Sequence, residues 1–225
     1  MSVSVVMIVR NGDRFLSAAI ESALGQTRPP DEVLVVDGGS SDRTVPIAVQ
    51  YGVAVTQQPA TGIADARNHG IASTCGRLLA FLDHDDVWLP TKLERQIEAL
   101  EKNSAAGYSV TMLRAIPAAH SITVHPVLAP LLARGPVRGL TPSTLVLRRS
   151  VLTTVGLFDP AFGIGADTDW FVRAADLGVT GAVVDEVLVE KQLHDRNASI
   201  DAGATRRELL RAARMSVQRK RHLAD

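Results

Sequence analysis

Residues 78–90, LLAFLDHDDVWLP, join a short apolar run to a dense cluster of charge. The run at 78–82 is typical of a strand that is buried on both faces of a parallel sheet. Three aspartates and one histidine fill positions 83–86, directly after that run. Because ligands bind outside the carboxyl ends of the strands in such sheets, the stretch predicts both a buried strand and a polar site at its end.

Buried strands and amphipathic helices alternate on both sides of this stretch. The predicted strands of the first half span residues 3–9, 31–37, 53–55 and 78–82. The predicted helices span residues 14–24, a short segment ending near 50, residues 63–73, and a segment opened by Thr91. This alternation predicts an α/β fold with a Rossmann-like, mostly parallel sheet and helices on both faces.

The pattern weakens in the second half of the chain. Strands are predicted at 108–113, 143–147, 179–184 and 187–193, with helices after Ser150 and over 167–177. Residues 115–141 contain four prolines and predict a long loop with short helical pieces, which in compact domains is often functional. A basic helix is predicted from about residue 204.

Composition excludes several classes of protein. The 24 basic and 24 acidic residues cancel, so no overall field favours a nucleic acid partner. The single cysteine excludes a disulfide framework and fits a reducing compartment. No apolar run approaches the roughly 20 residues of a membrane span, and the N-terminus lacks the features of a signal peptide. We therefore expect a cytoplasmic protein.

The aspartate cluster has a direct chemical use. Asp83 and Asp85 form an Asp-x-Asp pair that can face one hard divalent cation, Mn²⁺ or Mg²⁺, with coordination positions left for substrate phosphates. Such a cation neutralises the charge of a diphosphate leaving group. The alternative is a solvated acidic turn in which Asp86 caps the next helix. Apolar residues on both sides hold the cluster in place, which favours the metal site.

Seven blocks of this sequence resemble, in their order and spacing, those of the family 2 glycosyltransferases, which have the GT-A fold. They cover the chain from residue 3 to about 200. The blocks are residues 3–12, 32–44, 62–72, 81–90, 148–150 with 155–160, 165–170, and His194 with Asn197 and Ser199.

The resemblance implies a role for each matching residue. Asp167 would be the catalytic base, with Asp169 as a competitor two residues further on. The expected nucleotide-binding residues are Ile8, Val9, Arg10, Asn11, Asp37, Asp65, Arg67 and Asp83. The expected metal ligands are Asp83, Asp85, Asp86 and His194.

Three of these residues also have ordinary structural interpretations. Asp37 can cap its own turn, Arg67 can pair with Asp65, and a single histidine such as His194 is more often structural than a ligand.

The resemblance also implies an activity. One sugar would move from a nucleotide-diphosphate sugar, with a UDP-sugar favoured, to an acceptor hydroxyl by a metal-dependent single displacement with inversion. Gly38 stands where many members have a second aspartate that can contact uracil, which weakens the case for uridine. The processive motif Gln-x-x-Arg-Trp is absent, so we expect one sugar per encounter.

The resemblance divides the chain into three parts. Residues 1–103 would bind the nucleotide sugar, residues 104–203 would bind the acceptor and carry the base, and residues 204–225 form the basic helix. The acceptor is left open between a glycan, a lipid-linked molecule, a small molecule and a peptide. The alternative function is a non-catalytic nucleotide-sugar-binding module. A nucleotidyltransferase fits poorly, because its glycine-rich phosphate loop is missing.

The C-terminal segment has two interpretations. Residues 206–221 contain seven basic residues and one acidic residue, beside an apolar stripe of Leu209, Ala213 and Val217. The stripe favours a helix packed on the domain, with a solvated basic face. The alternative is a peripheral contact with an anionic membrane, at its inner face. A homodimer is left open.

Overall fold

A single nine-stranded sheet organises the protein in the computed structural model, which describes residues 1–118, 126–197 and 200–224. The strands lie in the order β3-β2-β1-β4-β8-β6-β9-β5, and β7 pairs with β6. Their bounds are β1 Val3–Val9, β2 Glu32–Asp37, β3 Ala54–Gln57, β4 Leu78–Asp83, β5 Asp86–Trp88, β6 Tyr108–Pro117, β7 Val137–Arg138, β8 Val146–Arg148 and β9 Gly181–Leu193.

The first four strands form the parallel half that the sequence predicts. β3, β2, β1 and β4 run parallel, with Val9 beside Asp37 and Ile8 beside Asp83. The carboxyl ends of β1, β2 and β4 therefore lie along one margin of the sheet, which we call the carboxyl edge. Val5 and Met7 pack into the core on one face and Val6 into the core on the other, as the side-chain alternation of a strand requires.

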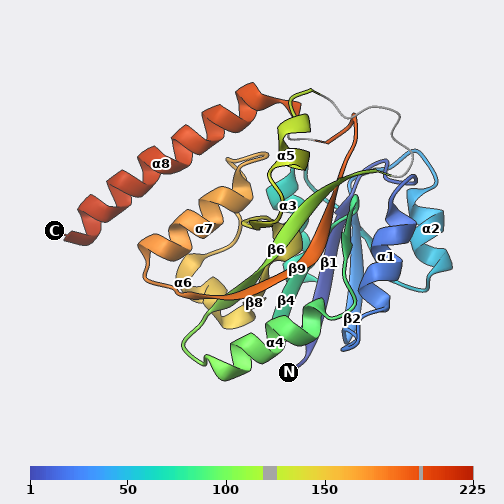
Figure 1. The fold of residues 1–225 in the computed structure, drawn as a ribbon, viewed down its shortest axis with the longest axis horizontal. Coiled ribbons are helices and arrows are strands. Elements are labelled where there is room, and N and C mark those ends of the chain that lie inside the picture. The colour runs from blue at the N-terminus through green and yellow to red at the C-terminus, as the bar shows by residue number, and fades with distance from the viewer. Residues whose placement is uncertain (119–125, 198–199, 225) are drawn as a thin grey trace.

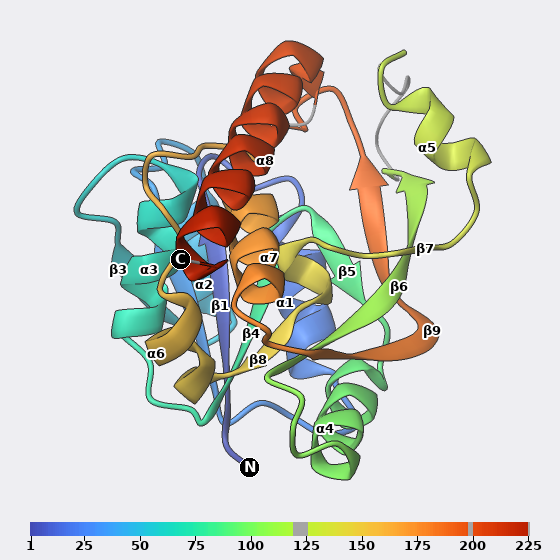
Figure 2. The ribbon, with the colours of Figure 1, turned by 90° about the vertical axis from the view of Figure 1, so that its left-hand side faces the viewer.

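Helices cover both faces (Figures 1 and 2). Apolar side chains of α1 (Leu16–Leu24), α2 (Thr44–Gln50) and α4 (Lys92–Lys102) belong to one core. Those of α3 (Ile63–Ala72), α6 (Leu152–Val155) and α7 (Ala166–Asp176) belong to the other. The predicted α/β architecture is thus confirmed, with strands buried between two helical layers.

The second half of the sheet is mixed, and here two strand predictions differ from the structure. β8 runs antiparallel to β4, which joins the two halves of the chain in one sheet. The strands predicted at 179–184 and 187–193 are one strand, β9, because Asp185 and Glu186 bulge out between its pairings with Thr111 and Met112 of β6. The strand predicted at 143–147 is only partly present: its first two residues belong to a 3-10 turn, η1 (Pro142–Thr144), and its last two belong to β8.

The predicted loop at 115–141 contains more regular structure than expected. β6 continues to Pro117, and α5 (Ala129–Ala133) and β7 follow. Residues 119–125 lie outside the described part of the chain.

The basic helix is α8 (Ala202–Ala224), which lies over α7 and continues beyond it toward the C-terminus (Figure 1). Among the described residues, no helix combines the length and the apolar character that crossing a membrane requires.

Candidate active site

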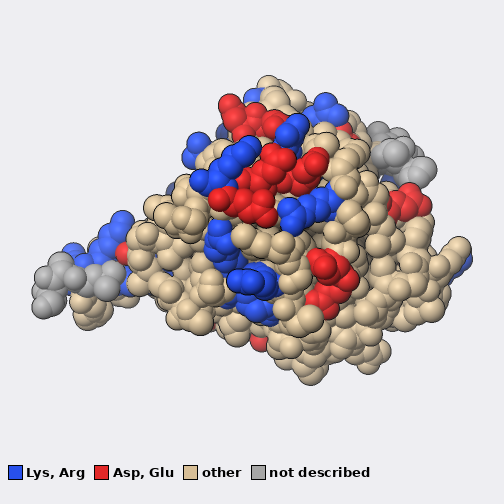
Figure 3. Space-filling model, turned by 90° about the horizontal axis from the view of Figure 1, so that it is seen from below, with Lys and Arg blue, Asp and Glu red and all other residues tan. Residues whose placement is uncertain are grey.

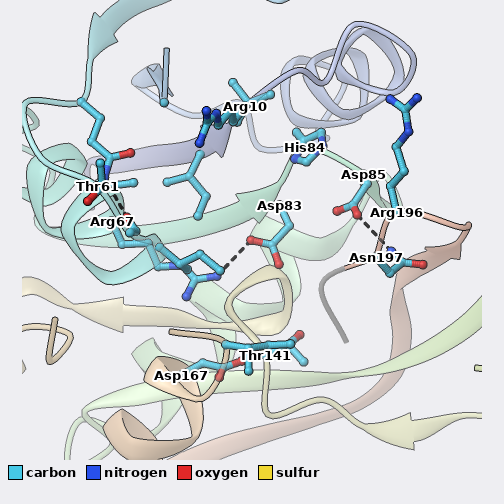
Figure 4. Close-up of a pocket in the computed structure, with 18 of the residues that line it drawn as sticks. Arg10, Thr61, Arg67, Asp83, His84, Asp85, Thr141, Asp167, Arg196 and Asn197 are labelled. Carbon is cyan, nitrogen blue, oxygen red and sulfur yellow. Dashed lines mark hydrogen bonds and ion pairs between the residues drawn. The ribbon is translucent and has the colours of Figure 1, made fainter. Parts of the chain in front are cut away.

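A cavity of about 560 Å³ opens at the carboxyl edge, between the two halves of the chain. The strand ends of β1 and β4 contribute to it from the first half, and Leu140 and Thr141 before η1, together with α7 and β9, line it from the second. Figure 4 shows its charged side chains facing one another from these elements. The aspartate, lysine and arginine residues in its lining are Arg10, Arg67, Asp83, Asp85, Asp167, Lys191 and Arg196.

The carboxylates of the acidic turn between β4 and β5 point in two directions. Asp83 and Asp85 line the cavity, whereas Asp86 begins β5 and is only 1% exposed. The buried Ser143 holds this arrangement: its hydroxyl donates to Asp86 Oδ2 at 2.6 Å and accepts from the Asp83 amide at 3.1 Å. Asp86 was predicted to be a metal ligand, but its side chain is buried, bonds to Ser143 and lies outside the cavity lining.

Asp83 forms an ion pair inside the cavity with Arg67. Arg67 Nη2 lies 3.1 Å from Asp83 Oδ1, and the arginine side chain is 6% exposed. The guanidinium also lies over the Phe158 ring, 5.5 Å from its centroid. Arg67 therefore pairs with Asp83 of the acidic turn, and not with Asp65, which the structural interpretation of the sequence suggested.

Asp85 forms a second polar group with His194 and Asn197. Its Oδ2 lies 3.0 Å from His194 Nε2 and accepts from Asn197 Nδ2 at 3.1 Å. The Arg196 amide donates to His194 Nδ1 at 3.1 Å, so the proton of a neutral ring lies on Nε2, facing Asp85. Phe15 stacks on the buried imidazole at 4.4 Å. His194 thus contacts Asp85 but does not itself line the cavity. Ser199, the third member of this block, lies outside the described residues.

Asp85 and Asp86 differ in their electrostatics. Burial alone would raise the pKa of Asp85, but the hydrogen bond from His194 and the charges of His84 and Lys191 hold it well below its usual range. Burial raises the pKa of Asp86 to about 7, against the opposing charge of Lys191, whose Nζ lies 3.8 Å from its Oδ1. The Asp86 charge in turn raises the pKa of Lys191. Lys191 therefore stays cationic beside the acidic turn.

Asp167 lies in the first turn of α7 and faces the cavity. Its Oδ1 accepts from the Thr168 amide at 2.8 Å. Burial raises the pKa of this carboxyl, and the nearby Arg67 charge acts in the opposite direction. Asp169, the competing candidate, is 1% exposed and pairs with Arg173 Nε at 2.7 Å. It lies outside the cavity lining, so of the two only Asp167 is placed to meet a ligand.

Three of the expected nucleotide-binding residues do not line the cavity in the described structure. Asp37 is 1% exposed and accepts from the Gly39 and Ser40 amides, so it caps its own turn. Asn11, at a φ of 52°, accepts from the Ser41 amide at 2.9 Å and supports the same turn. Asp65 lies in the first turn of α3, outside the lining. Ile8, Val9, Arg10, Arg67 and Asp83 do line the cavity.

Several lining residues were missed by the sequence reasoning. Lys191 is a lysine on the long strand β9, and Arg196 follows that strand in the turn that also holds His194. Their only signal was nearness to His194, because no local pattern places them beside Asp85. Other missed lining residues are Gln58, Thr61, His84, Thr141, Thr168 and Thr205.

The donor atoms fit a hard cation that is shared with a ligand. Asp83 and Asp85 both line the cavity and offer carboxylate oxygens, and His194 Nε2, 3.0 Å from Asp85 Oδ2, orients Asp85. Within the part of the chain that the structure describes, no group of three histidine, cysteine or acidic side chains is arranged to hold a metal. Mg²⁺ and similar ions often use only one or two carboxylates and complete their coordination with water and substrate phosphates. The arrangement fits that kind of site.

The fold and this cavity together define a class, a transferase with the GT-A fold. The sequence profile described as Glycosyl transferase family 2 matches residues 4–152. The chain therefore belongs to glycosyltransferase family 2.

Two relatives illustrate the sequence similarity. An uncharacterised glycosyltransferase of Rickettsia typhi is 32% identical over 219 residues, covering 86% of this chain and 64% of that protein. The UDP-Glc:alpha-D-GlcNAc-diphosphoundecaprenol beta-1,3-glucosyltransferase WfgD of Escherichia coli is 40% identical over 102 residues, covering 45% of this chain and 42% of that protein. The chain thus spans 64% and 42% of the length of these two relatives.

Two solved structures share the fold. S. aureus TarS in complex with UDP-GlcNAc superimposes with a TM-score of 0.77 at 18% identity, covering 97% of this chain and 66% of that one. Glucosyl-3-phosphoglycerate synthase from Mycobacterium tuberculosis, in complex with Mn²⁺, UDP and glucosyl-3-phosphoglycerate, gives 0.71 at 21% identity, covering 96% and 79%. At these identities the similarity shows the fold alone.

Proposed function

We propose that the protein transfers one sugar from a UDP-sugar to an acceptor hydroxyl, with inversion at the anomeric carbon. One observation carries the proposal: Asp167 from the second half and the Asp83–Asp85 turn from the first half line the same cavity. This arrangement supports a base and a diphosphate anchor acting in one site. The choice of UDP is supported by the relative named a UDP-Glc-dependent glucosyltransferase and by the neighbours solved with UDP-GlcNAc or UDP.

The donor would occupy the side of the cavity built by residues 1–103. Ile8, Val9 and Arg10 at the end of β1 face the same space as Gly38 and Gln58, and together they would hold the nucleoside. The absence of a side chain at Gly38 keeps part of this space open. A Cβ added at position 38 would lie 3.3 Å from the Arg10 side chain. Lys191 and Arg196 supply positive charge for the diphosphate.

Asp83 and Asp85 would hold Mn²⁺ or Mg²⁺, and His194 would contact the ion's ligand Asp85 rather than the ion. When bound, such an ion neutralises charge on the diphosphate leaving group. Asp86 takes no part, because Ser143 keeps it buried.

Asp167 would act as the general base on the acceptor. It takes the proton from the acceptor hydroxyl while that oxygen forms a bond to the anomeric carbon, and the bond from that carbon to the diphosphate oxygen breaks on the opposite face. The Arg67 charge opposes the effect of burial on Asp167 and so favours the ionised form that can accept the proton. Residues 104–203 would hold the acceptor beside it.

The test is a transfer assay that follows UDP release and product mass, with UDP-Glc, UDP-GlcNAc and UDP-Gal against hydroxyl acceptors that include lipid-linked saccharides. We expect Asp167→Asn to lower kcat by about 10² to 10⁴-fold, the usual contribution of a general base, and to leave UDP binding intact. Asp185→Asn, which changes an exposed aspartate of β9 outside the cavity, is the matched control. UDP binding without transfer in any acceptor mixture would instead favour a binding module.

A further inference from the structure

The C-terminal helix α8 packs its inner face against the domain and forms polar contacts there. Ala212 is 1% exposed in the core, and Glu208 accepts from the Gly163 amide at 3.0 Å. Arg219 and Lys220 both pair with Asp176 of α7, at 3.1 and 3.3 Å. The charges on this face therefore have partners within the protein.

The opposite side of α8 has a different character. Leu210 and Val217 lie seven residues apart, about two helical turns, and are 51% and 53% exposed. Four exposed arginines lie around them, and no hydrogen bond or ion pair of their side chains occurs among the described residues. We call these six residues the outer face of α8: Arg206, Arg207, Leu210, Arg214, Val217 and Arg221.

Charge is distributed unevenly along the chain. Residues 206–221 contain seven basic residues and one acidic residue, whereas the rest of the chain contains 17 and 23. In Figure 3 the C-terminal end of α8 projects beyond the body of the protein at the left and carries basic side chains. Positive charge is thus concentrated on a helix attached to a body in which acidic residues outnumber basic ones.

We propose that the outer face of α8 binds the surface of an anionic lipid bilayer. A helix with apolar residues between cations can lie in the headgroup region, with Leu210 and Val217 reaching toward the acyl chains and the arginines binding phosphates. The outer face contains four arginines and no acidic residue, so it complements the phosphates of an anionic lipid surface.

The position of α8 links this surface to the cavity. Thr205, in the first turn of α8, lines the cavity, so the helix begins at the rim of the candidate active site. A bilayer on the outer face would bring that rim close to the lipid surface, where a lipid-linked acceptor would present its sugar. The presentation of a lipid-linked acceptor to the cavity rests on the proposed function, whereas lipid binding itself does not.

The test is co-sedimentation of the full chain with vesicles of equal parts phosphatidylglycerol and phosphatidylcholine, and with vesicles of pure phosphatidylcholine. Because each Lys or Arg near an anionic surface contributes roughly a fivefold change in partition, changing the four outer-face arginines to glutamine should weaken binding more than about tenfold. Leu210→Ser with Val217→Ser should also weaken it. The matched control removes four exposed cations from other surfaces, Arg43, Arg77, Arg95 and Lys102, each changed to glutamine.

The expected result is sedimentation with the anionic vesicles only, lost in the outer-face variant and retained in the control. Equal sedimentation with both vesicles, or an equal loss in the control, would overturn the proposal. So would a wild-type dimer in light scattering that the outer-face variant dissociates without any lipid binding, because the face would then join two copies. Titration of UDP into the same variants separates the two proposals: lipid binding with no nucleotide binding would refute the proposed function alone.

Discussion

At the scale of single residues, Asp167 combines burial with a nearby opposite charge. Burial raises its pKa, and a base acts only when deprotonated, so activity should be lost as pH falls through that raised pKa. Arg67 opposes the shift, and Arg67→Gln should therefore move the acid limb of the kcat/KM profile to higher pH. Profiles of the two proteins from acid to mildly alkaline pH provide the measurement. An acid limb at an ordinary carboxyl pKa, unchanged in the variant, would contradict the assignment.

Lys92 is a second residue whose environment sets its charge. It is fully buried in the first turn of α4, its Nζ has no hydrogen-bond partner among the described residues, and Nζ lies 3.9 Å from the Trp88 ring centroid. A cation–π contact recovers about 0.5 to 2 kcal/mol, which is less than the cost of burying a charge. Burial therefore lowers the pKa of Lys92 well below its ordinary value, which favours the neutral amine in the folded protein.

Replacing this amine should stabilise the fold. The unfolded chain binds a proton at Lys92 that the native state releases, so this residue makes stability rise with pH toward the unfolded pKa. Lys92→Met removes the dependence and should raise the free energy of unfolding by about 1 to 3 kcal/mol, more at pH 6 than at pH 9. Denaturant titrations at both values measure it. Lys102→Met, on the exposed end of the same helix, is the control, and an equal effect there would refute the explanation.

At the scale of elements, η1 fixes the turn that carries the acids. Ser143 bonds both the Asp83 amide and the Asp86 carboxylate, and its carbonyl accepts from Trp88 Nε1 at 2.8 Å. Ser143→Ala would leave a buried carboxylate oxygen without its hydroxyl partner. We expect a loss of about 1 to 3 kcal/mol in the free energy of unfolding and weaker metal-dependent UDP binding. Ser150→Ala, on an exposed position, should change neither quantity, and wild-type UDP affinity in Ser143→Ala would show that η1 does not position the turn.

The same elements show how far the sequence alone can predict this structure. The apolar runs of β1, β2 and β4 predict their strands because both faces are buried, and the acids at 83, 85 and 167 follow from their positions in the family blocks. The inward direction of Asp86 depends on Ser143, which lies 57 residues away. The continuity of β9 depends on pairing with β6, and the break at Asp185 and Glu186 is a bulge that resembles a turn in sequence. Long-range contacts of this kind leave no local pattern.

At the scale of the whole molecule, the cavity exists only because the two halves meet. The β4–β8 pairing joins them, and each half contributes both acidic and basic side chains to the lining. Lys191 and Arg196, which balance the aspartates, come from the half with the weaker sequence pattern. From the sequence, the cavity's acids could therefore be predicted together with Arg10 and Arg67, but Lys191 and Arg196 could not.

The most direct measurement is a calorimetric titration of UDP, GDP and dTDP into the full chain, with Mn²⁺ and with EDTA, in wild type, Asp85→Asn and the control Asp185→Asn. Asp85 is held ionised beside Lys191 on the cavity, so we predict that UDP binds only with Mn²⁺, and that Asp85→Asn abolishes this binding while Asp185→Asn retains it. Equal UDP binding in EDTA would contradict the metal site. No nucleotide binding in the presence of Mn²⁺ would contradict the proposed donor site and, with it, the proposed reaction.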